Sequence, residues 1–180
     1  MVEYELLTNN FIGGWYTSTN LCQRIVDKCD HDSTSLLYDE PRQYSWSDLG
    51  EFDNDLCEEY CEQLINTIQH YTHKYPNSLQ HIKPWGFTRP RLQVYKPNDS
   101  YSVAHCENDG YPENAQRHLS YMTYLTTIKN GGGTMFTQQD VVTPSNAGLT
   151  VIWPAGWTHY HHGVSAPTET KYIITGWCCY

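Results

Sequence analysis

The sequence lacks long apolar segments. No apolar run approaches the roughly 20 residues that cross a bilayer. The first five residues, Met1 to Glu5, are acidic and lack the basic and apolar regions of a signal peptide. We therefore expect a soluble protein of the cytoplasm that has no contact with a membrane.

Basic residues are also scarce. The chain has 11 Lys and Arg residues against 20 Asp and Glu residues, which gives a formal net charge of −9. A protein that binds duplex DNA normally presents a basic face to the phosphates. Nucleic acid is therefore an unlikely partner.

Seven cysteines are present, but they do not form a recognisable framework. The number is odd, no pair has the spacing of a zinc ribbon, and Cys57 and Cys61 are four residues apart in a helical pattern. We expect free thiols, as in proteins of reducing compartments.

The first half of the chain has helical periodicity. Apolar residues at helical offsets predict a helix over residues 21–29 and a longer one over 54–75. In the longer helix we expect Asp53 or Asn54 to be the N-cap and Pro76 to end the helix. The simplest role for this helix is a scaffold packed on a sheet.

From Arg91 onward the pattern changes to short runs rich in Val, Ile, Thr, Tyr and Trp, separated by Gly, Pro, Asn and Asp. The predicted strands are 92–95, 101–105, 118–126, 133–136, 148–153, 159–164 and 170–177. Strands so short and so closely spaced are typical of an all-β sandwich or barrel. A length of 180 residues fits one domain, residues 1–180, in which a helical region with edge strands (1–90) supports a mainly β core (91–180).

The motif His105-Cys106-Glu107 is the strongest local indication of chemistry. On an extended segment, residues i and i+2 point to the same face, so His105 and Glu107 can reach one metal ion. The segment from Trp157 to Val164 contains three further histidines, His159, His161 and His162. One of them would complete a set of two imidazoles and one carboxylate, which suits Fe(II) or Mn(II) and leaves positions open for other ligands.

Lys171 follows this histidine cluster by about ten residues, on the next predicted strand. A cation there can pair with the far carboxylate of a dicarboxylate that chelates the metal, and such a charge-assisted bond is strong in an apolar barrel mouth. In contrast, Gly131-Gly132-Gly133 is interpreted as a tight turn, because no helix pattern follows it as a phosphate-binding loop requires.

Five segments in this order resemble the prolyl 4-hydroxylase branch of the 2-oxoglutarate/Fe(II)-dependent dioxygenases, particularly small members from bacteria and phages. The segments are Tyr95-Lys-Pro-Asn-Asp-Ser-Tyr101, His105-Cys-Glu107, Arg117-His-Leu-Ser-Tyr-Met-Thr-Tyr124-Leu, Gly131-Gly-Gly-Thr-Met-Phe136, and the histidine cluster through to Trp177. The resemblance implies a double-stranded β-helix, the jelly roll of cupins, buttressed by N-terminal helices. It also implies Fe(II), 2-oxoglutarate and O2, with ascorbate as reductant, in the cytoplasm of a bacterial or phage-infected cell.

The resemblance assigns residue roles as well. His105 and Glu107 match the proximal iron ligands, although many prolyl hydroxylases have Asp where Glu107 stands. Relatives often read Thr-His-x-His-Arg-Gly, which favours His161 as the distal ligand over His162 and His159. The remaining matches are Lys171, Tyr124 and Thr175 for the 2-oxoglutarate carboxylate, Tyr95 in the pocket wall, and Arg117 and Trp177 for a peptide substrate.

The resemblance therefore implies a dioxygenase that hydroxylates a prolyl residue in a peptide or protein. A hydroxylase of a free amino acid or small metabolite is the alternative enzyme. A non-enzymatic, cupin-like binding module is the alternative from another class; the presence of every ligand type and of Lys171 counts against it. The sequence does not indicate an oligomeric state.

Overall fold

The computed structural model describes residues 1–4, 10–80 and 83–180. Most of the strands form one nine-stranded antiparallel sheet. Along the sheet the strands follow the order β1 (Val2–Tyr4), β2 (Gly13–Tyr16), β10 (Leu149–Pro154), β7 (Arg117–Tyr124), β12 (Lys171–Cys179), β6 (Arg91–Tyr95), β4 (Tyr44–Asp48) and β3 (Leu37–Asp39). The short β5 (Gly86–Phe87) pairs with the end of β12. A smaller sheet has the order β11 (His161–Gly163), β8 (Thr134–Phe136) and β9 (Val141–Thr143).

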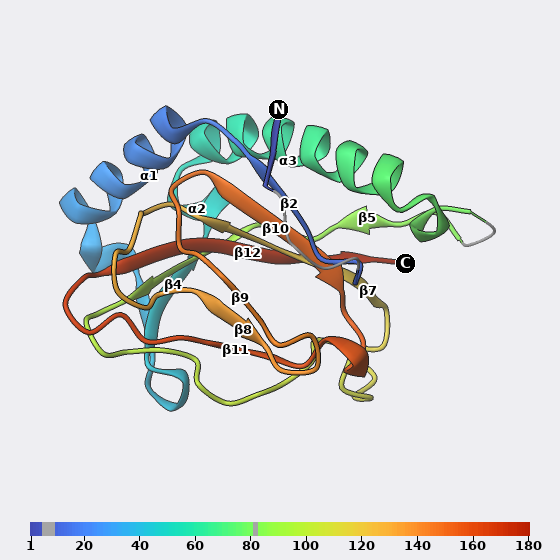
Figure 1. The fold of residues 1–180 in the computed structure, drawn as a ribbon. Helices are drawn as coiled ribbons and strands as arrows, with labels where there is room; N and C mark the ends of the chain where they lie inside the picture. The colour runs from blue at the N-terminus through green and yellow to red at the C-terminus, as the bar shows by residue number, and fades with distance from the viewer. Residues whose placement is uncertain (5–9, 81–82) are drawn as a thin grey trace.

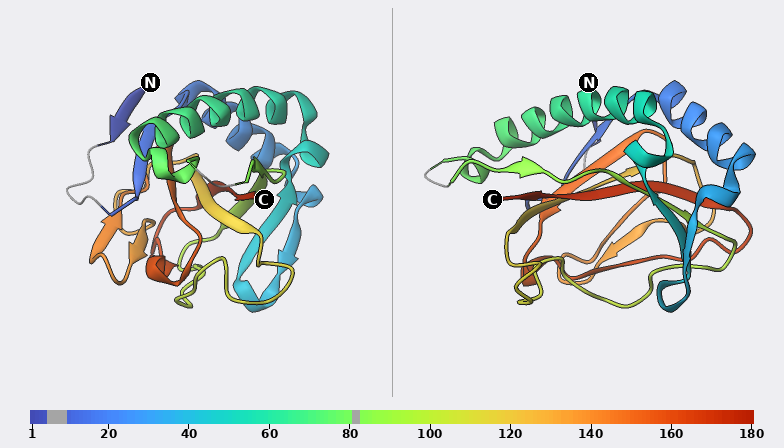
Figure 2. Two further views of the ribbon diagram at one scale, coloured as in Figure 1. Left: turned by 90° about the vertical axis from the view of Figure 1, so that its right-hand side faces the viewer. Right: turned by 180° about the vertical axis from the view of Figure 1, so that it is seen from behind.

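The helices cover one face of the large sheet, and the small sheet lies on its other side (Figure 1). They are α1 (Thr19–His31), α2 (Leu49–Phe52) and α3 (Asn54–Lys74); single 3-10 turns are η1 (Ser33–Ser35), η2 (Glu40–Arg42), η3 (Pro76–Ser78) and η4 (Trp157–His159). Figure 2 shows the same layers from two further sides. This arrangement is the helix-buttressed double-stranded β-helix that the sequence predicts.

The long helix α3 begins where the sequence predicts and ends within one residue of the predicted end, whereas α1 extends two residues beyond the predicted range 21–29 at each end. Asp53 caps α3 by accepting a hydrogen bond from the backbone N–H of Leu56 at 3.1 Å, and the helix ends at Lys74, two residues before Pro76. Ser18 caps α1 in the same way. The buried faces of both helices repeat at steps of three and four residues, as an amphipathic helix on a sheet requires.

Two apolar layers follow from strand alternation. Ile174 of β12 and Leu92 of β6 face the helices, together with most of the buried side chains of α1 and α3. Ile173 and Tyr95, their neighbours of opposite parity, face the small sheet. Residues of odd number on β12, and on β6 opposite it, therefore point into the space between the sheets.

Two predicted elements were wrong. Residues 101–105 do not form a strand, because this segment pairs with β11 only at one isolated bridge, His105 with His161. His159 lies in η4 rather than on a strand, so it does not share a strand face with His161.

Other features agree with the sequence or extend it. All seven cysteines are free thiols, as predicted. In residues 1–90 the structure locates the expected additional strands: β2 and β1 extend one end of the large sheet, and β4 and β3 extend the other. It also adds β9, which lies between β8 and β10 along the chain. No helix in the described residues is long and apolar enough to span a membrane.

Candidate active site

Backbone pairing brings His105, Glu107 and His161 together. The backbone N–H of His105 donates to the carbonyl of His161 at 3.0 Å, and the reverse bond measures 2.9 Å. Two residues further on, the N–H of Glu107 donates to the carbonyl of Ala155 at 3.0 Å. The loop before β7 is thus fixed to the chain around β11, and this places an i, i+2 pair of side chains beside a third ligand.

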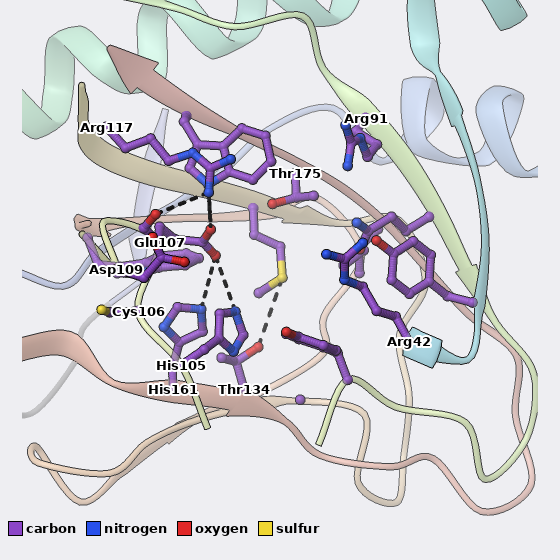
Figure 3. A pocket seen from close by; sticks show the side chains of 18 of the residues that line it. Arg42, Arg91, His105, Cys106, Glu107, Asp109, Arg117, Thr134, His161 and Thr175 are labelled. Carbon is purple, nitrogen blue, oxygen red and sulfur yellow. Dashed lines mark hydrogen bonds and ion pairs between the residues drawn. The ribbon is translucent and has the colours of Figure 1, made fainter. Parts of the chain in front are cut away.

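The three side chains converge on one point. Oε1 of Glu107 lies 3.4 Å from Nε2 of His105 and 3.5 Å from Nε2 of His161. One donor atom from each of the three residues lies within 4.8 Å of the others, which makes them a group able to hold a metal ion. Figure 3 shows both imidazoles directed at the carboxylate.

Both imidazoles have their other nitrogen fixed by backbone. Nδ1 of His105 lies 2.8 Å from the carbonyl oxygen of Val103, and Nδ1 of His161 lies 2.9 Å from that of His159. A carbonyl only accepts hydrogen bonds, so each Nδ1 carries a proton and each Nε2 is the nitrogen that faces Glu107. This is the arrangement that orients histidine ligands toward a metal.

The other two histidines of the cluster lie outside this group. Nε2 of His159 pairs with the carbonyl of Asn10 at 2.8 Å, and its Nδ1 pairs with the hydroxyl of Thr158 at 3.0 Å. His162 follows His161 on β11 and therefore points to the opposite face of the small sheet. Of the three histidines considered from the sequence, the structure brings His161 to Glu107.

Arg117 and Trp177 hold the second oxygen of the Glu107 carboxylate. The indole N–H of Trp177 donates to Oε2 at 2.7 Å, and Nη1 of Arg117 lies 3.3 Å from the same oxygen. The Arg117 guanidinium also stacks on the Trp177 ring, 3.8 Å from its centroid. Burial alone would raise the pKa of Glu107, but the hydrogen bonds and charges of His105 and His161 outweigh it and hold this pKa well below its usual range. Glu107 is therefore an oriented, ionised carboxylate.

Lys171 is a buried cation without an anion. Its side chain is only 4% exposed, and Nζ lies 4.6 Å from the centroid of the Tyr95 ring, its partner across β6 and β12. Within the described parts of the chain it forms no ion pair. Burial lowers the pKa of Lys171 from 10.5 to about 8. A bound carboxylate would reverse that penalty.

Residues 90–179, which make up half of the chain, match the family model described as "2OG-Fe(II) oxygenase superfamily". The chain belongs to this superfamily. Membership implies Fe(II), 2-oxoglutarate and O2, and two imidazoles plus a carboxylate are the donor set that suits non-haem Fe(II). No curated protein matches the sequence.

Solved structures show which oxygenase folds this chain resembles. A viral collagen prolyl hydroxylase from Paramecium Bursaria Chlorella virus-1, in complex with 2OG, is 16% identical with a TM-score of 0.66, over 95% of this chain and 96% of that one. A prolyl-4-hydroxylase from Pseudomonas putida is 17% identical with a TM-score of 0.68, over 95% and 93%. A Trichoplax adhaerens prolyl hydroxylase in complex with a hypoxia inducible factor peptide fragment is 15% identical with a TM-score of 0.71, over 95% and 84%. The oxygenase therefore has a prolyl hydroxylase-like fold.

In this oxygenase the three candidate ligands and Lys171 line one cavity of about 410 Å³ between the two sheets, a volume in the range of small-molecule sites. Tyr95, Thr175, Arg117 and Trp177, which the sequence also predicts, are in its wall. The wall further contains residues that sequence reasoning missed: Arg42, Tyr44, Arg91, Gln93, Tyr101, Met122, Thr134 and Trp153. Strand alternation from Tyr95 would have indicated Gln93 and Arg91; the contribution of η2 and β4 has no signal in the sequence.

Tyr124 lies behind the cavity wall of the oxygenase. Its hydroxyl is buried between the hydroxyls of Thr134 and Thr143, at 2.8 Å from each, and Tyr124 is not among the residues that line the cavity. Thr134, which accepts its hydrogen bond, is in the wall. The structure thus connects Tyr124 to the cavity through a threonine hydroxyl.

Proposed function

We propose that this protein is an Fe(II)- and 2-oxoglutarate-dependent dioxygenase that hydroxylates a prolyl residue in a peptide or protein, with His105, Glu107 and His161 as the iron ligands. One observation carries the proposal: a two-histidine, one-carboxylate group and a buried, unpaired lysine line the same cavity. A cupin-like binding module has no need for that lysine.

In the proposed reaction, different residues of the chain have different roles. Bound iron would supply the activation of O2 coupled to the oxidative decarboxylation of 2-oxoglutarate. Lys171 binds the distal carboxylate of 2-oxoglutarate, and the ring of Tyr95 holds the ammonium in place. Tyr124 acts on the same carboxylate by orienting the hydroxyl of Thr134. Thr175 lines the same cavity, and its hydroxyl donates to the backbone carbonyl of Tyr121 at 3.2 Å. The protein therefore contributes orientation and the exclusion of water.

The prolyl substrate is supported by the fold and by the site. Arg117 and Trp177, which match substrate positions in the family resemblance, orient Glu107 and also form part of the open cavity wall. The Trichoplax structure contains a peptide, which supports a peptide partner here. Ascorbate is proposed as the reductant that keeps the iron in its ferrous state.

We also propose that residues 1–180 act as a single domain, in which the helices and edge strands of residues 1–90 support the core of residues 91–180. One apolar layer of α1, α3 and the large sheet joins the two regions. Seven free thiols support a reducing compartment, the cytoplasm.

The test is the conversion of 2-oxoglutarate to succinate by the purified protein, with a proline-containing peptide present and its mass followed. We expect succinate formation that requires Fe(II) and a gain of one oxygen on the peptide. His105→Ala should abolish both, whereas His162→Ala, which changes a neighbouring imidazole outside the ligand group, should retain them. Full activity of His105→Ala would eliminate the assignment.

A further inference from the structure

Four of the 11 Lys and Arg residues line the cavity of this acidic protein: Arg42, Arg91, Arg117 and Lys171. Three acidic residues, Glu107, Asp109 and Glu113, line it as well. Arg42 pairs with Asp39 at 2.9 Å, and Arg117 pairs with Glu107. Lys171 has a role in the proposed function. Arg91 is left without an acidic partner, since it forms no ion pair with any described residue.

Arg91 is held in place by aromatic rings instead of a carboxylate. Its guanidinium carbon lies 4.5 Å from the centroid of the Trp46 ring and 5.7 Å from that of Trp177. The register partner of Arg91 on β4 is an acidic residue, Asp48. The carboxylate of Asp48 accepts hydrogen bonds from the backbone N–H groups at the start of α2, at 2.9 and 3.3 Å.

This setting leaves most of the donors of Arg91 available. Aromatic rings stack on the faces of a guanidinium, whereas its five N–H donors lie in its plane and match the two oxygens of a carboxylate. Arg91 also hydrogen-bonds the buried hydroxyl of Tyr44, and this bond and the charges of Arg42 and Arg91 oppose the rise in the pKa of Tyr44 that burial causes. Arg91 is thus a half-buried cation that keeps further donors for a ligand.

Arg91 is also close to the reacting centre. The indole that borders Arg91, that of Trp177, donates its N–H to the carboxylate of Glu107. Figure 3 places Arg91 on the side of the cavity away from Arg117, with Thr175 between them. An anion bound at Arg91 would therefore be separated from the candidate metal ligand Glu107 by about the width of the Trp177 indole.

The two carboxylates of 2-oxoglutarate are already assigned, one to Lys171 and one to the metal. We propose that Arg91 binds a carboxylate of the substrate that is hydroxylated, within about one residue of the reacting carbon. This inference rests on the proposed function and narrows its substrate class to anionic substrates. The carboxylate belongs either to an acidic residue next to the target in a peptide or to a free amino acid.

The experiment compares two matched pairs of probes that differ by one negative charge. The first pair is the blocked peptides acetyl-Ala-Pro-Glu-amide and acetyl-Ala-Pro-Gln-amide; the second is L-proline and L-prolinamide. Binding is measured by calorimetry on the full chain with Mn(II) and 2-oxoglutarate in the absence of oxygen. We expect the charged member of one pair to bind at least about tenfold more tightly, as for a charge-assisted pair in a partly buried site. The pair that shows this preference identifies the source of the carboxylate.

Three variants test whether Arg91 causes the preference. Arg91→Gln should reduce it to less than about twofold, and Arg91→Lys, which keeps the charge but loses the planar fork, should restore part of it. Arg89→Gln is the matched control, because Arg89 is 78% exposed and does not line the cavity; it should keep the full preference. Equal binding within both pairs, or a preference that survives Arg91→Gln, would overturn the inference.

Succinate formation from 2-oxoglutarate, assayed on the same protein, separates this inference from the proposed function. Iron-dependent succinate formation without a charge preference refutes the role of Arg91 alone. A charge preference that depends on Arg91, without any succinate formation, refutes the dioxygenase and leaves the anion site standing.

Discussion

Lys171 is a buried, titratable residue whose protonation should control the binding of 2-oxoglutarate. Burial lowers its pKa to about 8, while a bound carboxylate favours the protonated amine. The affinity for 2-oxoglutarate should therefore be constant below pH 8 and fall above it, by up to about tenfold per pH unit. Calorimetry with Mn(II) between pH 7 and 9.5 measures this decline. Lys171→Arg, which stays charged throughout, should remove the pH dependence.

The same burial means that Lys171 destabilises the folded protein when no carboxylate is bound. Because the pKa of the folded state lies below the ordinary value of 10.5, the folded protein binds fewer protons than the unfolded chain between pH 8 and 10.5. Its stability should thus rise with pH across that window. At pH 7 the cost is fully present, so Lys171→Met should raise the free energy of unfolding by up to about 3 kcal/mol, at roughly 1.4 kcal/mol per pKa unit. Urea denaturation at pH 7 and 10 tests both the size and the sign; a loss of stability at pH 7 would contradict the account.

Trp177 provides a residue-level test of how Glu107 is oriented. Trp177→Phe keeps an aromatic ring on which Arg117 can stack, and it removes the indole N–H that donates to Oε2 at 2.7 Å. We expect a loss of about 10–100-fold in Mn(II) affinity, as for other groups that orient metal ligands. Trp85→Phe is the control, because that indole N–H donates to the carbonyl of Ser78, away from the cavity wall. If the Mn(II) affinity of Trp177→Phe were unchanged, Arg117 by itself would be sufficient to orient the Glu107 carboxylate.

At the scale of elements, the turn between β7 and β8 is fixed by a glycine. Gly131 has φ of +77°, and a Cβ there would lie 2.0 Å from the carbonyl oxygen of Ser165. Gly131→Ala should therefore lower the free energy of unfolding by about 2–4 kcal/mol. Gly156→Ala, at a position with nothing within 4 Å of the added carbon, should change it by no more than about 0.5 kcal/mol. Denaturation midpoints of the two variants check the contrast.

The elements also show how far the sequence predicts this structure. Helical spacing predicts α1 and α3, and the ordered motifs predict the group of His105, Glu107 and His161 and the neighbouring Lys171. The segment 101–105 has the alternating pattern of a strand. In the structure it forms only one bridge to β11, and a tertiary contact of this kind cannot be predicted from the local sequence pattern. The sequence predicts strands in residues 1–90 without their positions. The positions of β1 to β4 depend on the sheet that they join, so neither these positions nor the place of Arg42 in the cavity wall can be predicted from the sequence alone.

At the scale of the whole molecule, the helical layer and the cavity lie on opposite faces of the large sheet. Leu64 of α3 is 1% exposed in the apolar layer, and Leu64→Ala should lower the free energy of unfolding by about 2–5 kcal/mol. Because the folded protein keeps its ligand geometry, the Mn(II) affinity below the unfolding transition should not change. The adjacent Ile65 is 44% exposed, and Ile65→Ala should cost less than about 1 kcal/mol. A parallel loss of metal affinity in Leu64→Ala would show that the two faces are coupled.

The lone backbone bridge between His105 and His161 has a consequence for how such a molecule can diversify. The long excursion from Lys96 to Gln116 forms a strand-like pair with the small sheet only at that rung. Single backbone hydrogen bonds hold it at Asn98, Tyr101, Glu107 and Asn108 as well, and the rest of its length has no strand pairing. Insertions, deletions and new side chains on either side of the rung can accumulate over generations while the imidazoles keep their spacing. Descendants of one ancestral catalyst can in this way acquire new targets without rebuilding the centre that performs the oxidation.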